Sequence, residues 1–597
     1  MKKILVLFIA VLVVFAATGC GGKKQQDDID LSGEKPEKAV VVDFWMYGDD
    51  VELGVYRKLV QEFNKKYDGY VYVNLRHKAP TDYTQGLMQV LNGKNGPDVF
   101  YVEEIGFKAM AEAGYLLDIT SYVEKSTEYD VTKMWESATT RFQYDVTTKT
   151  VNGPNKKYYA VPKDIGPTVI FYNETMFKSA GINIISVSKE DLAAFNNEGK
   201  ADSRGKTKAQ YGISCEVKEK GYFVDANGTK WFNNQIAMNW EETVAISNQI
   251  QSVHKNSFGY FTEWWFNYGW TVGGDCVQYI PTNDSDYLGG YWDFTLMDPT
   301  PNYIVADDAE PFTINDNTYY PGEIISYIDK LVNEAEGTPG QTYNVSKVVE
   351  ESVEAACAAG QLNKLPSQRD AFVEFVRLAA PTNKLIYTTD EGERLYGYGI
   401  TPSPSAIGGD SGKTSAFTTG EVAMLVDGRW NVTNFREQMT DEWDVAPLPV
   451  YKEYDANGDV AVHGVNAGHS GSIGVAINKK CSVPNAAWLF LEFIGGEYGQ
   501  AEQSKTGFAI PLQKELAQDE EIFLQTNQSP RNSIIFLEAA EAQKAGDWWY
   551  LRDNKWIDPW AGLLNGSVRN GKLDLNQFAN AKEFIDTYKT LLTYTKK

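Results

Sequence analysis

The sequence predicts an α/β protein with at least two lobes. Strand-like and helix-like patterns alternate between residues 39 and 102 in the order βαβαβ, which favours a parallel sheet with helices on its faces. The chain has 597 residues, of which 43% are hydrophobic. Because a single hydrophobic core stops growing near roughly 250–300 residues, a chain of this length is expected to build more than one.

Five segments carry the alternation. A β-branched run over residues 39–45 predicts a buried strand, and residues 51–63 then place an apolar side chain at every fourth position, on one helical face. A second strand is expected over residues 70–75 and a second helix over residues 83–91. The third strand, residues 99–102, follows a Gly-Pro-Asp turn.

Polar and aromatic side chains follow two of these strands. Trp45, Tyr47 and Asp50 come after the first strand, and Glu103 and Glu104 come after the third. In open α/β sheets, ligands bind beyond the carboxyl ends of the strands. We therefore expect these side chains to converge on one edge of the sheet and to contribute to a binding site.

The N-terminus has the pattern of an export signal. Lys2 and Lys3 precede an uncharged apolar run over residues 4–17, which ends just before Cys20. This run is shorter than the about 20 apolar residues that a spanning helix needs. Residues 1–19 are therefore predicted to be a secretory signal peptide that is removed from the mature protein.

The sequence Ala17-Thr18-Gly19-Cys20 resembles a bacterial lipobox, although Ala17 stands where the family usually has Leu. The resemblance implies that Cys20 is diacylated and becomes the new N-terminus, so that the protein is anchored to the outer face of the cell membrane without spanning it. Residues 20–38 are almost free of apolar side chains and read as a flexible tether.

Charge and cysteine usage narrow the function. A net charge of −24 argues against nucleic acid or a polyanionic ligand, which would need clusters of Lys and Arg. Besides Cys20, four scattered cysteines lack the short paired spacings of zinc or redox sites: Cys215, Cys276, Cys357 and Cys481. They fit either one or two disulfides or free buried thiols.

No motif indicates catalysis, a metal or a cofactor. The chain has four histidines, and none belongs to a zinc-protease, nucleophile-elbow or P-loop motif. Residues 455–459 resemble the start of a calcium loop, but the twelfth position is Asn466 where such loops have Glu. A hairpin turn is the better interpretation of this segment.

Several ordered blocks carry a family resemblance. They are residues 62–66, 96–100, 113–120, 159–164 and 171–181, and then residues 417–430, which end in Gly428-Arg429-Trp430, followed by 444–449 and 486–493. In order and spacing these blocks resemble the family 1 extracellular solute-binding proteins of ABC importers, which are maltose-binding-protein-like. The resemblance covers most of residues 39–180 and 369–515.

This resemblance implies a type II periplasmic-binding-protein-like fold, in which two α/β lobes are joined by hinge crossover strands. Lobe 1 is expected over residues 39–163 and 431–515, and lobe 2 over residues 164–430 and 516–597. Two regions depart from the family pattern and are expected to be insertions, near residues 182–239 and 280–368.

Carbohydrate is the expected ligand because aromatic rings cover the C–H faces of sugars while carboxylates and amides bind their hydroxyls. The resemblance implies that Trp430 stacks on a sugar ring. Further candidates are Trp264, Trp265 and Asp164. His469 lies in a glycine-containing segment that precedes a predicted strand over residues 473–477. The glycines of this segment would let backbone amides approach a ligand or the hinge.

We therefore expect a monomeric, non-catalytic lipoprotein that captures an oligosaccharide and delivers it to the membrane subunits of an ABC permease. Two other classes stay open from the sequence. One is a surface-anchored carbohydrate-active enzyme, because acidic residues are abundant enough to form a catalytic pair in space. The other is a sugar-sensing partner of a membrane kinase.

Overall fold

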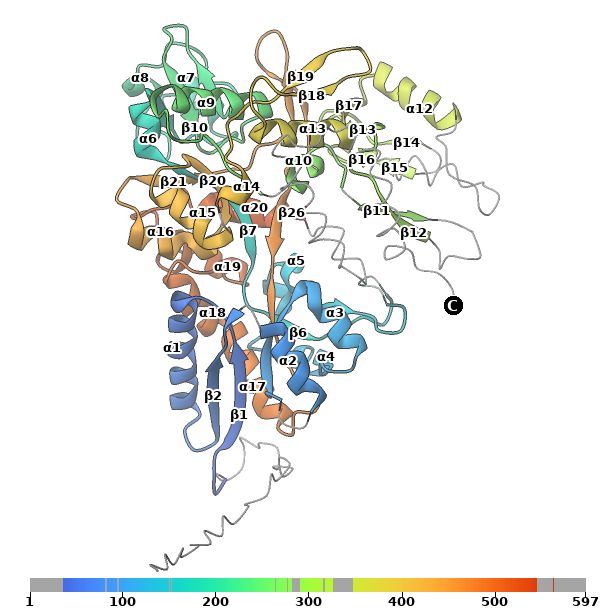
Figure 1. The fold of residues 1–597 in the computed structure, drawn as a ribbon, viewed down its shortest axis with the longest axis vertical. Helices are drawn as coiled ribbons and strands as arrows, with labels where there is room; N and C mark the ends of the chain where they lie inside the picture. The colour runs from blue at the N-terminus through green and yellow to red at the C-terminus, as the bar shows by residue number, and fades with distance from the viewer. Residues whose placement is uncertain are drawn as a thin grey trace, which may run out of the picture.

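The computed structural model describes residues 36–80, 83–93, 96–149, 151, 153–263, 265–275, 277–281, 290–314, 317–325, 347–407, 409–544 and 562. Two mixed sheets, each flanked by helices, stand one above the other in Figure 1. They form two lobes connected by crossover strands, which confirms the predicted fold class. The predicted signal peptide, Cys20 and most of the tether lie outside the described residues.

The first lobe contains a five-stranded sheet in the order β2-β1-β3-β25-β6. Its strands are β1 (Val40–Met46), β2 (Val71–His77), β3 (Val99–Glu103), β6 (Ala160–Pro162) and β25 (Ile473–Ile477). Strand β1 runs parallel to β2 and β3, whereas β25 runs antiparallel to β3 and β6. The predicted βαβαβ order is confirmed.

Helices and short elements complete this lobe. They are α1 (Asp50–Lys66), α2 (Tyr83–Asn92), α3 (Glu104–Glu112), α4 (Thr120–Val123), η2 (Val131–Lys133), α5 (Glu136–Thr139), β4 (Gln143–Tyr144), β5 (Lys157–Tyr158), α17 (Pro484–Gly495), α18 (Glu497–Lys505), α19 (Lys514–Ala517) and η4 (Glu520–Leu524). The core forms where the apolar face of α1 meets α17: the ring of Phe63 lies 5.2 Å from that of Phe490. Asp49 caps α1 by accepting a hydrogen bond from the Glu52 amide at 2.9 Å.

The second lobe contains a sheet in the order β20-β7-β24-β26, with β21 also paired to β7. Its elements are β7 (Gly166–Asn173), α6 (Glu174–Ser179), α9 (Trp240–Val253), α10 (Phe266–Trp270), α13 (Gln368–Ala379), β18 (Leu385–Thr388), β19 (Arg394–Tyr396), α14 (Pro404–Ile407), α15 (Gly409–Thr418), β20 (Met424–Gly428), η3 (Arg429–Asn431), α16 (Val432–Gln438), β21 (Trp443–Ala446), β22 (Lys452–Tyr454), β23 (Val460–His463), β24 (Gly468–Gly471), α20 (Ile534–Glu541) and β26 (Gln543–Lys544). All eight residues of β7 are buried, as expected for a central strand.

The lobe boundary differs from the sequence-based one at α19 and η4, where residues 516–524 pack with α18 of the first lobe, and over one longer stretch. Residues 431–471 were expected in lobe 1, but β21 forms an antiparallel ladder with β7 and β24 pairs with the start of β7. These backbone hydrogen bonds place the stretch in the second lobe, and a local sequence block does not reveal which sheet a strand joins. The chain returns to the first lobe at Ser472, between β24 and β25.

Two crossover segments lie side by side between the lobes. One is residues 163–165, between β6 and β7, and the other is Ser472. The Lys163 amide donates a hydrogen bond to the carbonyl oxygen of Ile473 at 2.8 Å, which joins the two segments. Figure 1 shows β7 passing between the upper and lower sheets, and β24, which pairs with the start of β7, leads through Ser472 into β25 of the first sheet.

Small sheets occupy the two regions expected to be insertions. The first has the strand order β8-β10-β9 with two short helices: β8 (Ile182–Ile185), α7 (Leu192–Asn197), α8 (Lys208–Tyr211), β9 (Tyr222–Val224) and β10 (Lys230–Asn233). The second contains β11 (Val277–Pro281), β12 (Gly290–Phe294), β13 (Pro301–Val305), β14 (Phe312–Ile314), β15 (Asn317–Tyr319), β16 (Ile324–Ile325), α12 (Lys347–Ala358) and β17 (Leu362–Ser367). Both lie on the second lobe: the first is at the end remote from β1 and β2, and the second extends to the side, where β11 and β12 lie below α12 (Figure 1).

Two smaller predictions have clear outcomes. Residues 455–459 form the turn between the antiparallel strands β22 and β23, with Gly458 at a φ of 83°, so the hairpin interpretation is confirmed. Cys215 and Cys357 are half-buried free thiols. The sulfur of Cys481 accepts a hydrogen bond from the Val483 amide at 3.4 Å, and Cys276 lies outside the described residues.

Candidate functional site

A large cavity opens between the two lobes, against the crossover segments. Its volume is about 1190 Å³. Residues of both lobes line it: Tyr47, Asp49, Glu52, Glu103, Glu104, Lys163, Asp164, Gly166, Glu263, Trp265, Phe266, Ser411, Thr414, Ser415, Thr418, Thr419, Trp430, Asn431, Asn434, Gln438, His469, Gly471, Ser472, Ile473 and Phe508. This position, at the carboxyl ends of β1 and β3, is where ligands bind open α/β sheets.

The predicted convergence of side chains after β1 and β3 is present. The hydroxyl of Tyr47 donates a hydrogen bond to Oε1 of Glu103 at 2.7 Å. Burial and the adjacent Glu103 carboxylate raise the pKa of Tyr47, so its hydroxyl stays protonated and continues to donate. The pair fixes the Glu103 carboxylate at the cavity wall.

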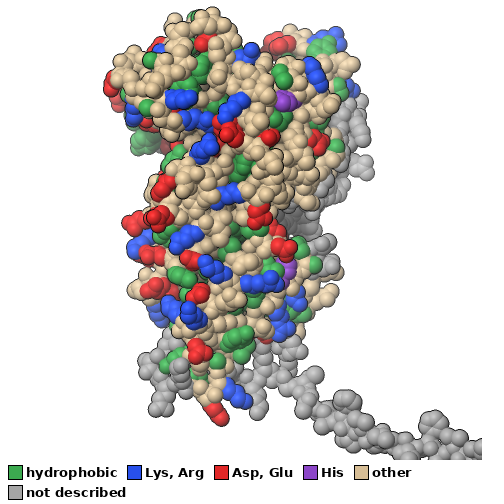
Figure 2. Space-filling view, turned by 90° about the vertical axis from the view of Figure 1, so that its left-hand side faces the viewer, with side chains coloured by type: hydrophobic (Ala, Val, Ile, Leu, Met, Phe, Trp, Pro, Cys, Tyr) green, Lys and Arg blue, Asp and Glu red, His purple; other side chains and the backbone are tan. Residues whose placement is uncertain are grey.

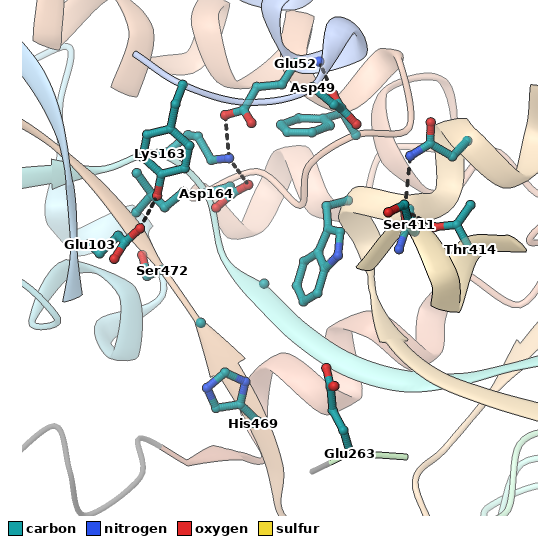
Figure 3. A pocket seen from close by; sticks show the side chains of 18 of the residues that line it. Asp49, Glu52, Glu103, Lys163, Asp164, Glu263, Ser411, Thr414, His469 and Ser472 are labelled. Atoms are coloured by element: carbon teal, nitrogen blue, oxygen red, sulfur yellow. Dashed lines mark hydrogen bonds and ion pairs between the residues drawn. The ribbon is translucent and has the colours of Figure 1, made fainter. Parts of the chain in front are cut away.

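A buried cluster of charges sits where the first crossover begins. Nζ of Lys163 lies 2.8 Å from Oε1 of Glu52 and 3.7 Å from Oδ2 of Asp164 (Figure 3). Burial alone would lower the pKa of Lys163, but Asp164 and Glu52 together raise it. Burial raises the pKa of Glu52 and that of Asp164, although Lys163 opposes both shifts. The ammonium group therefore stays charged and is shared by two carboxylates.

Glu104 and His469 form another part of the wall. Oε2 of Glu104 lies 3.2 Å from the Arg141 guanidinium, and both side chains are buried. Burial, assisted by Arg141, lowers the pKa of His469 to about 3, so the imidazole is neutral at physiological pH. A neutral imidazole offers one donor and one acceptor nitrogen.

The part of the wall contributed by α15, η3 and α16 of the second lobe is mostly polar and uncharged. Hydroxyl side chains line the cavity from positions 411, 414, 415, 418 and 419, a spacing that puts them on one face of α15 and its C-terminal end. Asn431, the last residue of η3, and Asn434 and Gln438 of α16 add amide groups. Figure 3 shows Ser411 and Thr414 on the side of the cavity opposite Glu103 and Asp164.

Trp430 lines the cavity and packs closely against the backbone at two glycines, Gly428 and Gly166. A Cβ added to Gly428 would lie 1.9 Å from Cζ3 of the Trp430 ring, and one added to Gly166 would lie 3.3 Å from the same atom. Only glycine at position 428 permits this approach without a shift of the ring or the backbone. Trp265 and Phe266, at the start of α10, add further aromatic surface to the cavity.

The structure brings seven of the predicted binding residues together. Those that line the cavity are Tyr47, Glu103, Glu104, Asp164, Trp265, Trp430 and His469. Trp45 and Asp50 lie outside the lining: Trp45 projects from β1 beneath Nζ of Lys78, which is 4.0 Å from the ring centroid, and Asp50 is exposed in the first turn of α1. Trp264 lies outside the described residues.

Sequence reasoning missed the α15 and α16 face and the pair Glu52 and Lys163. The spacing of Ser and Thr at positions 411, 414, 415, 418 and 419 was a readable helical signal. Among the described residues, no cluster of three or more His, Cys, Asp or Glu side chains has an arrangement suited to a metal ion. In the same part of the chain, no helix combines the length and apolar character needed to cross a bilayer.

The two lobes, the paired crossover segments and the cavity between them define the class of two-lobed solute-binding proteins. The chain matches the family model described as bacterial extracellular solute-binding protein over residues 58–295 and 335–528. This chain therefore belongs to the bacterial extracellular solute-binding proteins, and a location outside the cytoplasmic membrane, extracellular or periplasmic, follows from that membership.

A curated relative is the arabinooligosaccharide-binding protein of Bacillus subtilis (strain 168), 26% identical over 258 residues, or 39% of this chain. The chain spans about half, 52%, of that relative's length. Three solved structures share the fold across 93% of this chain. A Listeria monocytogenes substrate-binding protein in complex with cycloalternan is 16% identical with a TM-score of 0.55 and 99% of its length covered. The GacH receptor of Streptomyces glaucescens, solved unliganded and with acarbose, is 14% identical, with a TM-score of 0.53 and 99% of its length covered. Maltose-bound MalE3 of T. maritima is also 14% identical, with a TM-score of 0.53 and 100% of its length covered.

Proposed function

We propose that this protein captures an oligosaccharide between its two lobes and delivers it to an ABC permease. The observation that carries the proposal is the composition of the cavity, which combines an indole ring with a carboxylate wall and a hydroxyl and amide wall. A relative named for arabinooligosaccharide binding and fold neighbours solved with cycloalternan, acarbose and maltose support the same ligand class.

Each wall has a physical counterpart on a sugar. Trp430 and Trp265 offer flat apolar surface to the C–H faces of pyranose or furanose rings. Glu103 and Asp164 accept hydrogen bonds from sugar hydroxyls, and Asn431 and the hydroxyls of α15 both donate and accept them. The volume of about 1190 Å³ exceeds the roughly 300–1,000 Å³ of ordinary small-molecule sites, which favours several linked sugars over one.

The placement of this cavity at the crossover segments would couple ligand binding to closure of the two lobes. Because the ligand contacts both lobes, it favours the conformation in which the lobes are closed, and a hinge at residues 163–165 and Ser472 would allow this closure. We propose that the permease recognises the closed, loaded form of a monomeric protein. No covalent step is required.

Isothermal titration calorimetry against arabinotriose, maltotriose, xylotriose and longer homologues tests the proposal. We expect binding to at least one series and a loss of affinity of about tenfold or more in Trp430→Ala, since stacking on an aromatic ring contributes over ~1.4 kcal/mol. Trp45→Ala changes a tryptophan outside the cavity and is expected to bind normally. Silence across every sugar, alongside a response to peptides or polyamines, contradicts the proposed ligand class.

The same samples distinguish a binding protein from a carbohydrate-active enzyme. After prolonged incubation, chromatography of the bound sugar is expected to recover it intact. Shorter products that appear with the wild-type protein, and not with heat-denatured protein, contradict the proposal that binding is the whole function.

We further propose that Cys20 carries the lipid anchor and that residues 20–38 act as the tether. A tether raises the effective concentration of the loaded protein near the permease. Cys20→Ser is expected to release the protein from the membrane fraction without changing its sugar affinity. Retention of this variant on the membrane contradicts the anchor.

A further inference from the structure

The cavity holds far more negative than positive side chains. Among the described residues, six carboxylates line it, against the one ammonium group of Lys163: Asp49, Glu52, Glu103, Glu104, Asp164 and Glu263. The outer face in Figure 2 looks different, because Lys and Arg alternate with Asp and Glu over its whole height. The excess of carboxylates is therefore a feature of the cleft as well as of the total charge.

Several of these carboxylates already have a cation. Lys163 is shared by Glu52 and Asp164, as described above, and Arg141 pairs with Glu104. Nζ of Lys413 lies 2.5 Å from Oε1 of Glu263. Lys108 also lies beside Glu104, but burial lowers its pKa to about 7, so it carries only part of a charge at neutral pH. These pairs leave two carboxylates of the cavity without an ion-paired cation among the described residues, although the charge of one of them, Asp49, also acts on Lys163.

The two remaining carboxylates are those of Asp49 and Glu103. Within the described part of the chain, neither forms an ion pair with a cationic side chain. Asp49 accepts the capping hydrogen bond of α1, and Glu103 accepts the hydroxyl of Tyr47. Both line the cavity and are exposed to solvent, so their charges are within reach of a bound ligand.

We propose that this cleft selects sugars by charge: it admits neutral and amino sugars and excludes acidic ones, with Asp49 and Glu103 setting the selection. The inference rests on the proposed function, because it describes which sugars the same cavity accepts. A carboxylate or sulfate on the ligand would lose hydration and meet Glu103 with no unshared cation to pair with. An ammonium group at the same place would pair with Glu103.

Matched probes test this selection. Each parent trisaccharide of the panel (arabinotriose, maltotriose and xylotriose) is converted at its reducing end into a neutral alditol, an anionic aldonate and a cationic 1-amino-1-deoxyalditol. The three share length and an open-chain terminus and differ in charge. Calorimetry is expected to show the aldonate weaker than the alditol by about tenfold or more, because like charges at close range cost several kcal/mol.

The amino derivative is expected to bind at least as tightly as the alditol, and added salt should narrow both differences. An aldonate that binds as well as the alditol, or an equal loss for all three probes, overturns the charge selection while the parent sugars still bind. Silence of the parent sugars themselves is the distinct outcome in which the proposed function fails, and the selection fails with it.

Two conservative variants assign the effect to residues. Glu103→Gln keeps the shape of the side chain, and Asp49→Asn keeps a good helix N-cap. In each, the aldonate-to-alditol affinity ratio is expected to rise by roughly fivefold, as for removal of one nearby charge. Glu391→Gln removes the same charge from an exposed turn between β18 and β19 and should leave the ratio unchanged. An unchanged ratio in both cavity variants overturns their assignment.

Discussion

Lys163 is the cation shared by Glu52 and Asp164 at the first crossover, and its replacement tests whether it stabilises these buried carboxylates. Lys163→Met keeps most of the aliphatic volume of the side chain but leaves Glu52 and Asp164 without Nζ, which lies 2.8 Å and 3.7 Å from their oxygens. Only 7% of Glu52 and 9% of Asp164 is exposed to solvent. Water therefore cannot replace the lost ammonium group efficiently.

The expected cost follows from this burial. Breaking a buried ion pair by removing one partner costs about 3–5 kcal/mol. We expect a value near ~3 kcal/mol, because Glu52 keeps the hydrogen bond donated by the Tyr101 hydroxyl at 3.0 Å and either carboxylate can take up a proton. Since proteins are stable by about 5–15 kcal/mol, the loss is a substantial fraction of the total.

Denaturant unfolding of wild type and Lys163→Met at pH 7 and pH 5 measures the cost. Burial raises the pKa of Glu52 and that of Asp164, and removal of the Lys163 charge raises both further. A carboxylate whose pKa is raised by folding adds stability at low pH and loses that contribution as pH rises through its folded pKa. The wild-type advantage should therefore be smaller at pH 5 than at pH 7.

A second substitution sharpens the test. Glu52→Gln in the Lys163→Met background removes one of the stranded charges and should recover part of the lost stability. A loss at pH 7 below about 1 kcal/mol, the range of an exposed pair, refutes the reasoning. So does a loss of the same size at pH 5 and pH 7.

Two more outcomes are expected. Gly428→Ala should displace the Trp430 ring, because the added Cβ would lie 1.9 Å from Cζ3 of that ring. We expect a loss of stability of about 1–3 kcal/mol and a lower sugar affinity in calorimetry. The control is Gly54→Ala in α1, where the added Cβ meets no atom within 4 Å and should not destabilise the protein. For His469, whose pKa falls from 6.5 to about 3 on burial, the unfolded chain binds the proton more readily, so stability is lost as pH falls below 6.5. His469→Gln should remove about 2 kcal/mol of that loss at pH 5 in unfolding experiments, and identical pH dependence in both proteins argues against a buried neutral imidazole.

Local periodicity was sufficient to predict the βαβαβ part of the first lobe. Residues 51–63 place apolar side chains on one face, and α1 buries that face against α17. The rule that parallel strands end at one edge also predicted the meeting of Tyr47 with Glu103. These features depend on residues close in sequence or on strand polarity alone, so the sequence contains the necessary information.

Features that depend on pairing between distant segments were not predictable in the same way. Trp45 follows the alternation of β1, which turns its ring away from the cavity and under Lys78, whereas Tyr47 lies beyond the strand and lines it. Glu52 is an ordinary acidic residue in the first turn of α1 until Lys163, from a remote segment, lies beside it. The edge that β21 joins is likewise set by its ladder with β7.

The order of strands in the first sheet constrains when this lobe can form. Strand β25 lies between β3 and β6, yet residues 473–477 are synthesised long after both neighbours. Until then the backbone groups at the inner edges of β3 and β6 have no strand to pair with, and closing the gap joins distant parts of the chain, which is slow. The late arrival of a central strand therefore keeps the first sheet incomplete until residues 473–477 are available to pair with both neighbours.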